Sequence, residues 1–367
     1  MIERVHAFVD ATVAGSDPDL RFEELALQVF AYQFERVPLY RRFCEGRGAT
    51  PGTVASWQEV PAIPADAFKD ELTPPADGAV VFLSSGTTQG EQRRSRHRVS
   101  PENLQLYRRS SLAHFAAMAM PDRPGEMDVL VLGPMAATHP TSSLGHMFEW
   151  IACEHGGGAR TPPFTALSAD GTLDVSAAVA WLAAAAAGTR PVLILALSSA
   201  ITAVFETLRT RRLELRLPAD SRLVDTGGSK GGRVLSRNGI LKAAWRFLHI
   251  PAYLCTSEYG MTELLSQYYD DALRSRWCGS LSPRAKVGPA WAKAMVVDAA
   301  TLQPVPAGER GLLRHFDLAN VESVSAIQTL DVGHTIGNGL EVVGRASMAE
   351  SRGCSSLVSM LEAGPST

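Results

Sequence analysis

A run of apolar residues at positions 79–83 opens abruptly into a polar, glycine-rich turn, Ser84-Ser85-Gly86-Thr87-Thr88-Gln89-Gly90. Glycine lets the backbone point its N–H groups towards an anion, and the four hydroxyl side chains can donate to phosphate oxygens. Positively charged or titratable side chains follow at once: Arg93, Arg94, Arg96, His97 and Arg98. The stretch predicts a buried strand that leads into a loop for a polyphosphate.

This loop is not the P-loop of the common nucleotide-binding proteins. Glu91 and Gln92 follow Gly90, where a Lys and a Ser or Thr would be required. Taken alone, the stretch is also compatible with an ordinary Ser/Thr/Gly turn after a strand. The remaining motifs decide between these interpretations.

A second glycine-rich turn, Gly227-Gly228-Ser229-Lys230-Gly231-Gly232, follows a predicted strand at residues 221–226. The spacing Gly-x-Ser-x-Gly is that of the nucleophile elbow of α/β-hydrolases, which would make Ser229 a nucleophile. The pair Gly227 and Gly228 could instead let the backbone approach the flat face of an adenine. A plain tight turn is the third interpretation, and these residues alone leave all three open.

The most specific motif is Tyr259-Gly260-Met261-Thr262-Glu263. Hydroxyl and carboxylate oxygens are the hard ligands that magnesium and its phosphates accept. An acidic residue is also common in the first turn of a helix, so the pentapeptide could merely start one. Two further short elements lie downstream, Thr329-Leu330-Asp331-Val332-Gly333 and Gly344-Arg345.

In this order, the first loop, the pentapeptide and the two downstream elements resemble the motifs of the adenylate-forming superfamily of acyl-CoA synthetases and luciferases, which activate a carboxylate with ATP, and the turn with Gly227 and Gly228 resembles the glycine pair that precedes the pentapeptide there. The match extends from Ser84 to Arg345 and so covers most of the chain. The resemblance implies that the first loop binds the phosphates of ATP and that Tyr259 stacks near the adenine. It also implies roles for Thr262 on the α-phosphate, Glu263 on Mg²⁺ and Asp331 on the ribose hydroxyls. The full set of implied nucleotide-binding residues is Ser84, Ser85, Gly86, Thr87, Thr88, Gly90, Gly227, Gly228, Tyr259, Gly260, Met261, Asp331 and Arg345.

The sequence continues for only a short distance after Arg345, so we expect the superfamily's C-terminal lid domain, with its catalytic lysine, to be absent. Among short members the chain is most similar to the acyl-protein synthetases of bacterial bioluminescence, which transfer an activated fatty acid to their own cysteine and then to a reductase. Residues 350–355 resemble the tail of those enzymes, which makes Cys354 the expected nucleophile. Arg352 beside it could lower the pKa of the thiol. The alternatives are a truncated acyl- or aryl-CoA ligase, a catalytically degenerate nucleotide-binding protein and the serine hydrolase.

Predicted strands and helices alternate through the middle of the chain. Apolar strands are expected at residues 128–132, 191–197 and 221–226, and helices at 101–120, at 174–187 and up to residue 208. Such alternation predicts an α/β layered core with a mostly parallel sheet. Strands at 294–298 and 311–315, separated by a proline- and glycine-containing turn, predict a smaller antiparallel β unit. We therefore expect an adenylate-forming core at 1–290 and a β-rich subdomain with the tail at 291–367.

Composition limits the possible partners and compartments. The 367 residues are 46% hydrophobic and 20% charged, and the formal net charge of −3 predicts no general affinity for nucleic acids or anionic membranes. No signal peptide is visible, and five scattered cysteines favour neither a disulfide framework nor a zinc ribbon. We expect a soluble, cytoplasmic enzyme that uses ATP and Mg²⁺, takes a carboxylic acid, and passes the acyl group to a reductase, a carrier protein or coenzyme A.

Overall fold

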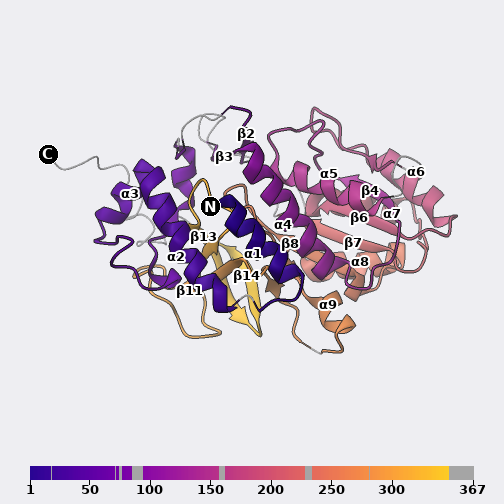
Figure 1. Cartoon of the computed structure of the whole chain (residues 1–367). Coiled ribbons are helices and arrows are strands. Elements are labelled where there is room, and N and C mark those ends of the chain that lie inside the picture. Colours follow the sequence, from indigo (N-terminus) through magenta and orange to yellow (C-terminus); the bar gives the residue numbers. More distant parts are fainter. Residues whose placement is uncertain are drawn as a thin grey trace. The chain divides into compact units, whose positions relative to one another are not determined.

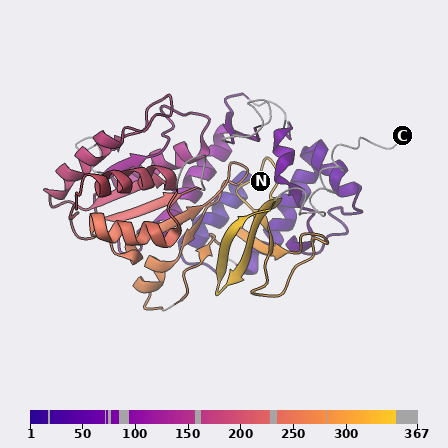
Figure 2. The same ribbon diagram turned by 180° about the vertical axis from the view of Figure 1, so that it is seen from behind.

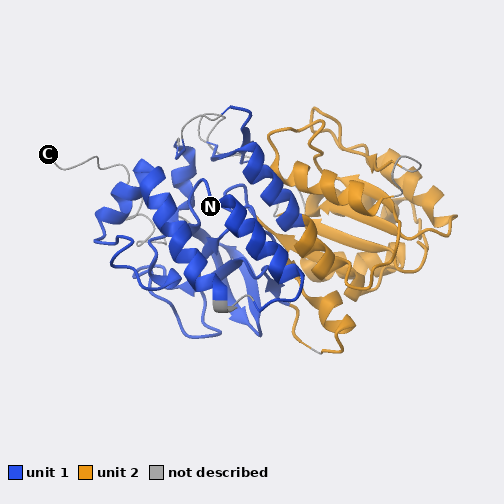
Figure 3. Ribbon diagram, viewed as in Figure 1, with its two compact units in different colours: residues 1–111, 261–267, 285–367 blue, residues 112–260, 268–284 orange. Residues whose placement is uncertain are grey.

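The computed structural model describes residues 1–17, 19–70, 72–73, 77–84, 94–156, 162–227, 234–280 and 282–346. The chain forms two compact units (Figure 3). Unit 1 comprises residues 1–111, 261–267 and 285–367, and unit 2 comprises residues 112–260 and 268–284. Each unit is assembled from segments that are separate in the sequence. The division at residues 290 and 291 stays a prediction.

Unit 2 contains the parallel sheet that the strand–helix alternation predicts. Its strands are ordered β9-β8-β7-β6-β4-β5. Strands β4 to β8 run parallel, and β9 pairs antiparallel with β8 at the edge. Their bounds are β4 (Asp128–Leu132), β5 (Phe164–Thr165), β6 (Val192–Leu197), β7 (Arg222–Thr226), β8 (Cys255–Tyr259) and β9 (Tyr268–Asp270). Residues 192–196 of β6 are all completely buried, as a strand covered on both faces requires.

Helices cover this sheet (Figure 1). They are α5 (Ser143–His155), α6 (Val175–Ala186), α7 (Ser198–Thr210), α8 (Arg237–Leu248) and α9 (Ala272–Trp277), with a 3-10 turn η5 (Ala252–Leu254). Three of them begin at a side-chain cap, supplied by Ser142, Asp174 and Ser236.

Unit 1 holds the predicted antiparallel strands. Its sheet has the order β11-β12-β13-β14-β10, all antiparallel, and the short β1 pairs parallel with β13. Figure 2 shows the long β13 and β14 in yellow. The bounds are β1 (Ile63–Pro64), β10 (Lys286–Val287), β11 (Ala292–Val297), β12 (Gly311–Asp317), β13 (Ala326–Ile336) and β14 (Gly339–Arg345).

The N-terminal helices of unit 1 are α1 (Ile2–Val13), α2 (Asp19–Arg36) and α3 (Pro38–Glu45), followed by the 3-10 turns η1 (Trp57–Glu59) and η2 (Ala65–Lys69). The long α4 (Pro101–Ala119) begins as the sequence predicts, because the Ser100 hydroxyl accepts a hydrogen bond from the Asn103 amide at 3.1 Å. No helix in the described ranges is both long enough and apolar enough to cross a bilayer.

The apolar run before the glycine-rich loop forms a strand as predicted, but the prediction that this strand is buried is wrong for most of its length. It forms β2 (Val80–Leu83), which pairs antiparallel with β3 (Arg96–Val99) in a separate two-stranded sheet. Within β2 only Phe82 is buried. Antiparallel neighbours can be joined by a short connection, which suits the segment 84–95 between β2 and β3, so this pair of strands does not continue the alternation that builds the parallel sheet.

Candidate active site

The β2–β3 hairpin fixes both ends of the glycine-rich loop. The ladder continues beyond the paired Leu83 and Arg96, because the Ser84 amide donates to the Ser95 carbonyl at 3.0 Å. The Ser95 amide in turn donates to the Ser84 hydroxyl at 2.9 Å. The predicted loop residues Ser85, Gly86, Thr87, Thr88 and Gly90 lie outside the described residues. Ser84 and Ser95 therefore define where the chain leaves and rejoins the hairpin.

Glu263 lies beside this hairpin in unit 1. Its side chain is buried, and the Ser95 hydroxyl hydrogen-bonds its carboxylate. Burial raises the pKa of Glu263 above its usual value, and the nearby Asp331 carboxylate raises it further. The bond from Ser95 and the positive charge of Arg345 oppose that rise. Two motifs that are far apart in sequence thus meet at one carboxylate.

Asp331 and Arg345 are brought together by strand pairing. They lie directly opposite each other on β13 and β14, with 3.9 Å between Arg345 Nε and Asp331 Oδ1. The guanidinium is 66% exposed, so its attraction to Asp331 is largely screened by water. Gly333 has a packing role in the same strand pair. It lies at a register shift, where an added Cβ would come within 2.5 Å of the Glu341 carbonyl oxygen.

His97 has a role that the sequence did not indicate. The sequence groups it with the cationic residues after the loop, but it is buried, and burial lowers its pKa to about 4, so it is neutral near pH 7. Its Nδ1 lies 2.9 Å from the Thr262 carbonyl oxygen, and its Nε2 lies 2.9 Å from the Ser323 hydroxyl. A carbonyl only accepts, so Nδ1 carries the proton and Nε2 accepts from Ser323. The available signal for its burial was the alternation of residue types along residues 95–99. In an extended strand Ser95, His97 and Val99 lie on one face, which is buried, whereas Arg96 on the other face is exposed.

Two buried polar residues, one at the end of β12 and one just after it, also contact the segment around Glu263, and sequence reasoning missed both. Asn320 Nδ2 donates to the Glu263 carbonyl at 2.7 Å. Asp317 accepts from the amides of Leu265 and Ser266 at 3.0 and 2.8 Å. Burial raises the pKa of Asp317 to about 6, although hydrogen bonds oppose the shift. Polar residues inside an otherwise apolar stretch were the only signal for them.

In unit 2, Gly227 and Tyr259 lie at the carboxyl ends of two neighbouring parallel strands. Gly227 follows β7 and Tyr259 ends β8, and the preceding residues Thr226 and Glu258 are paired in register and hydrogen-bonded through their side chains. Gly227 has a φ of +88°, which a residue with a side chain would adopt only with strain. Ligands of open α/β sheets bind at this edge. Gly228 lies outside the described residues.

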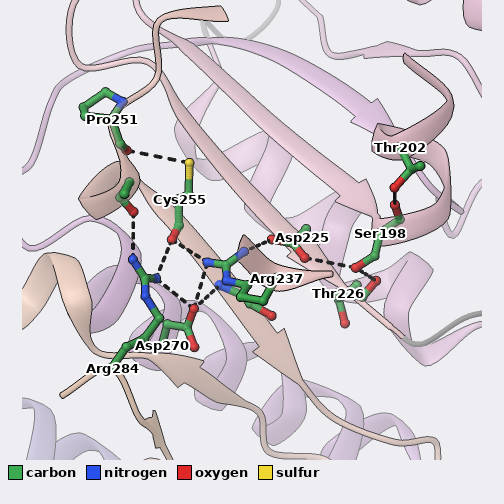
Figure 4. A network of polar contacts seen from close by, with 11 residues as sticks. Ser198, Thr202, Asp225, Thr226, Arg237, Pro251, Cys255, Asp270 and Arg284 are labelled. Atoms are coloured by element: carbon green, nitrogen blue, oxygen red, sulfur yellow. Dashed lines mark hydrogen bonds and ion pairs between the residues drawn. The ribbon is translucent and has the colours of Figure 1, made fainter. Parts of the chain in front are cut away.

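A buried ionic network lies between these strands and β9 (Figure 4). Arg237 bonds the carboxylates of Asp225 and Asp270, and Arg284 also bonds Asp270, at 2.9 Å. Both arginines donate to the Cys255 carbonyl, at 2.6 and 2.8 Å. Two positive charges therefore balance two aspartates that are almost fully buried, which a low-dielectric interior requires. The network ties β7, β8 and β9 together and was not predicted.

The described helix after β7 is α8, which begins at Arg237, where the Ser236 side chain caps it. The nucleophile-elbow interpretation of Ser229 stays a prediction. Ser229 itself lies outside the described residues.

Comparisons with known proteins identify the fold. No protein-family profile matches the chain, and no curated protein matches it. Among solved structures, a 2-hydroxyisobutyryl-CoA ligase in complex with 2-HIB-AMP and CoA superposes with a TM-score of 0.62 at 14% identity, covering 89% of this chain and 69% of that one. The luciferase-like enzyme of the mealworm Zophobas morio superposes with a TM-score of 0.51 at 15% identity, covering 76% of this chain and 60% of that one. The chain therefore shares the fold of these two enzymes.

This fold confirms the predicted α/β architecture with a mostly parallel sheet. At such low identity the likeness defines the fold and not the reaction. The described contacts show that Ser84, Glu263, Asp331 and Arg345 belong to one unit.

Proposed function

We propose that this protein activates a carboxylic acid with ATP to form an acyl-adenylate and then transfers the acyl group to a thiol. One observation carries the proposal. Within unit 1, the Glu263 carboxylate contacts the hairpin that bears the glycine-rich loop and lies in the field of Asp331 and Arg345. The chain also shares its fold with a ligase whose structure holds 2-HIB-AMP and CoA.

In the first step a substrate carboxylate oxygen attacks the α-phosphorus of ATP. The bond from that phosphorus to the bridging oxygen breaks, which releases pyrophosphate. Catalysis of this kind depends mostly on positioning and on neutralising charge. The Thr262 hydroxyl would donate to the α-phosphate, and Asp331 would accept from the ribose hydroxyls.

Glu263 fits the role of a magnesium ligand. It is a buried carboxylate whose charged form is disfavoured by desolvation and by the neighbouring Asp331, so a divalent cation would stabilise it. When bound, Mg²⁺ would neutralise phosphate charge. The exposed Arg96 and the half-buried Arg94 and Arg98 would add positive charge after the loop, whereas the neutral His97 would not.

In the second step a thiolate attacks the acyl carbon of the mixed anhydride, which forms a thioester and releases AMP. Two cysteines are poor candidates for this nucleophile. Burial raises the pKa of Cys44 and of Cys255 to about 12, so both are protonated thiols at neutral pH. We propose a fatty acyl substrate with Cys354 as the first acceptor. A reductase or carrier protein would then take the acyl group from Cys354. Coenzyme A is the alternative acceptor, and Cys354 lies outside the described residues.

The deciding experiment is exchange of labelled pyrophosphate into ATP, measured across a panel of fatty and aryl acids. We expect exchange that depends on one class of acid and is abolished by EDTA. ATP binding without acid-dependent exchange would identify a degenerate nucleotide-binding protein. Labelling of Ser229 by a fluorophosphonate, without ATP consumption, would identify a hydrolase.

A further inference from the structure

Two consecutive main-chain carbonyls of the Thr262-Glu263 dipeptide are held by buried side chains from other parts of unit 1. The Thr262 carbonyl accepts from His97 Nδ1 at 2.9 Å, and the Glu263 carbonyl accepts from Asn320 Nδ2 at 2.7 Å. His97 is 1% exposed and Asn320 is 0% exposed. Neither contact involves a substrate-binding side chain directly.

The two carbonyls restrict the conformation of Glu263. Each peptide unit is planar, so holding a carbonyl oxygen in place limits how far its whole plane can turn. The Thr262 carbonyl restrains the plane before the Glu263 Cα, and the Glu263 carbonyl restrains the plane after it. Together these restraints narrow φ and ψ of Glu263, and hence the direction of its Cα–Cβ bond.

His97 is itself rigidly held. Its Nε2 accepts from the Ser323 hydroxyl at 2.9 Å, and its ring packs edge-on against Phe68 with 5.3 Å between ring centroids. Ser95 and His97 are two residues apart in an extended segment, so they project from the same face. They contact successive parts of one dipeptide, Ser95 at the Glu263 carboxylate and His97 at the Thr262 carbonyl.

Asn320 is fixed from both sides. Its Oδ1 accepts from the Leu265 amide at 3.0 Å, and its own carbonyl accepts from Gln33 Nε2 at 2.8 Å. Gln33 also donates to the Ser325 hydroxyl at 2.9 Å and accepts from the Ser325 amide at 3.0 Å. A fully hydrogen-bonded network of this kind makes a small displacement of Asn320 costly.

We propose that His97 and Asn320 are positioning residues that aim the Glu263 carboxylate through the main chain. The inference rests on the proposed function, in which Glu263 holds Mg²⁺. Through Ser95 and His97, the strand that leaves the glycine-rich loop sets the geometry of the magnesium ligand. A displacement of about 1 Å at a catalytic site can cost about 100-fold in rate, and loss of a hydrogen bond that supports a metal ligand typically costs about 10- to 100-fold in metal affinity or activity.

The test uses the full chain with His97→Ala, His97→Asn and Asn320→Ala, and Tyr40→Phe as the matched control. Tyr40 is buried in the same unit and donates to the Pro61 carbonyl at 2.9 Å, so the control loses a bond of the same kind away from Glu263. In pyrophosphate exchange, both alanine variants should lose about 10- to 100-fold in kcat and need more Mg²⁺ for half-saturation. His97→Asn should recover most of the rate, because its Nδ2 can donate from nearly the position of the imidazole Nδ1. Tyr40→Phe should lower the melting temperature but leave kcat and the Mg²⁺ requirement unchanged.

Amide hydrogen exchange of residues 261–267 supplies a measurement that needs no substrate. Protection in this segment should fall in the alanine variants and stay unchanged in Tyr40→Phe. Should the parent show no acid-dependent pyrophosphate exchange, the proposed function is wrong, and the protection of 261–267 still decides whether the dipeptide is held as inferred. The positioning role is overturned if that protection is unchanged in both alanine variants. With an active parent, it is also overturned if they keep the parental kcat and Mg²⁺ requirement, or if Tyr40→Phe loses as much activity as they do.

Discussion

Replacing Glu263 by Gln should separate activity from stability. Gln has almost the same size and can still accept the hydrogen bond from Ser95, so the site should remain packed. The change removes one negative charge from a buried position beside Asp331. We expect the rate of adenylation to fall while the folded state is retained.

The rate effect follows from losing an ionic metal ligand in a buried site. Such an interaction contributes several kcal/mol to the transition state, and about 3–4 kcal/mol corresponds to roughly 100- to 1,000-fold in rate. The substitution should affect stability in the opposite direction from activity. Because the pKa of Glu263 is raised in the folded state, the carboxyl group contributes fully to the free energy of unfolding below its unfolded-state pKa. That contribution is lost as pH rises through its folded-state pKa. At pH 8 the parent therefore carries a buried charge at a cost that the Gln variant does not have.

The assay is pyrophosphate exchange at pH 8 with a titration of Mg²⁺, together with urea unfolding at pH 5 and pH 8. Glu341→Gln is the matched control, because it removes a carboxylate that is 55% exposed on β14 of the same sheet. Exchange should fall only in Glu263→Gln, whose free energy of unfolding at pH 8 should equal or exceed that of the parent. Near-normal exchange in Glu263→Gln would refute the assignment of this residue to Mg²⁺. A lower unfolding free energy at pH 8 would refute the reasoning from its raised pKa.

Three further predictions test other residues. Asp331→Ala should weaken ATP binding at least tenfold in calorimetry, since a charge-assisted hydrogen bond contributes about 1.5–3 kcal/mol, and an unchanged affinity would place the ribose elsewhere. Cys354→Ser should still form acyl-adenylate but retain no labelled acyl group through a hydroxylamine-sensitive bond, and labelling as complete as in the parent would exclude a carrier role. Burial raises the pKa of Asp317 from 3.8 to about 6, so its contribution to stability is complete below about pH 4 and lost by pH 7. At about 1.4 kcal/mol per pKa unit, the loss is about 3 kcal/mol in the free energy of unfolding, measured with urea. Asp317→Asn should flatten this pH dependence. An equally steep dependence of the unfolding free energy on pH in the variant would contradict the assignment of the titration to Asp317.

Local features of the chain could be predicted from the sequence because their causes lie within a few residues. Apolar runs separated by helical segments predicted β4, β6 and β7 of the parallel sheet. The helix predicted to begin at residue 101 is observed as α4, and the Ser100 cap at its start depends only on neighbouring amides. The motifs around Glu263 and Asp331 were likewise visible as residue types at fixed spacing.

Only the tertiary structure decided which of these residues meet, and what their chemical states are. The sequence could not show that the strand before the glycine-rich loop pairs with the strand after it, because an apolar run of this length suits either sheet. Nor could it show that His97 is neutral and bonded to the Thr262 carbonyl, or that Asn320 holds the next carbonyl. A side chain's protonation state depends on how much water and charge surround it, and that environment is built by segments distant in the chain. The sequence therefore supplied the reactive groups, and long-range packing set their partners, their charge and their direction.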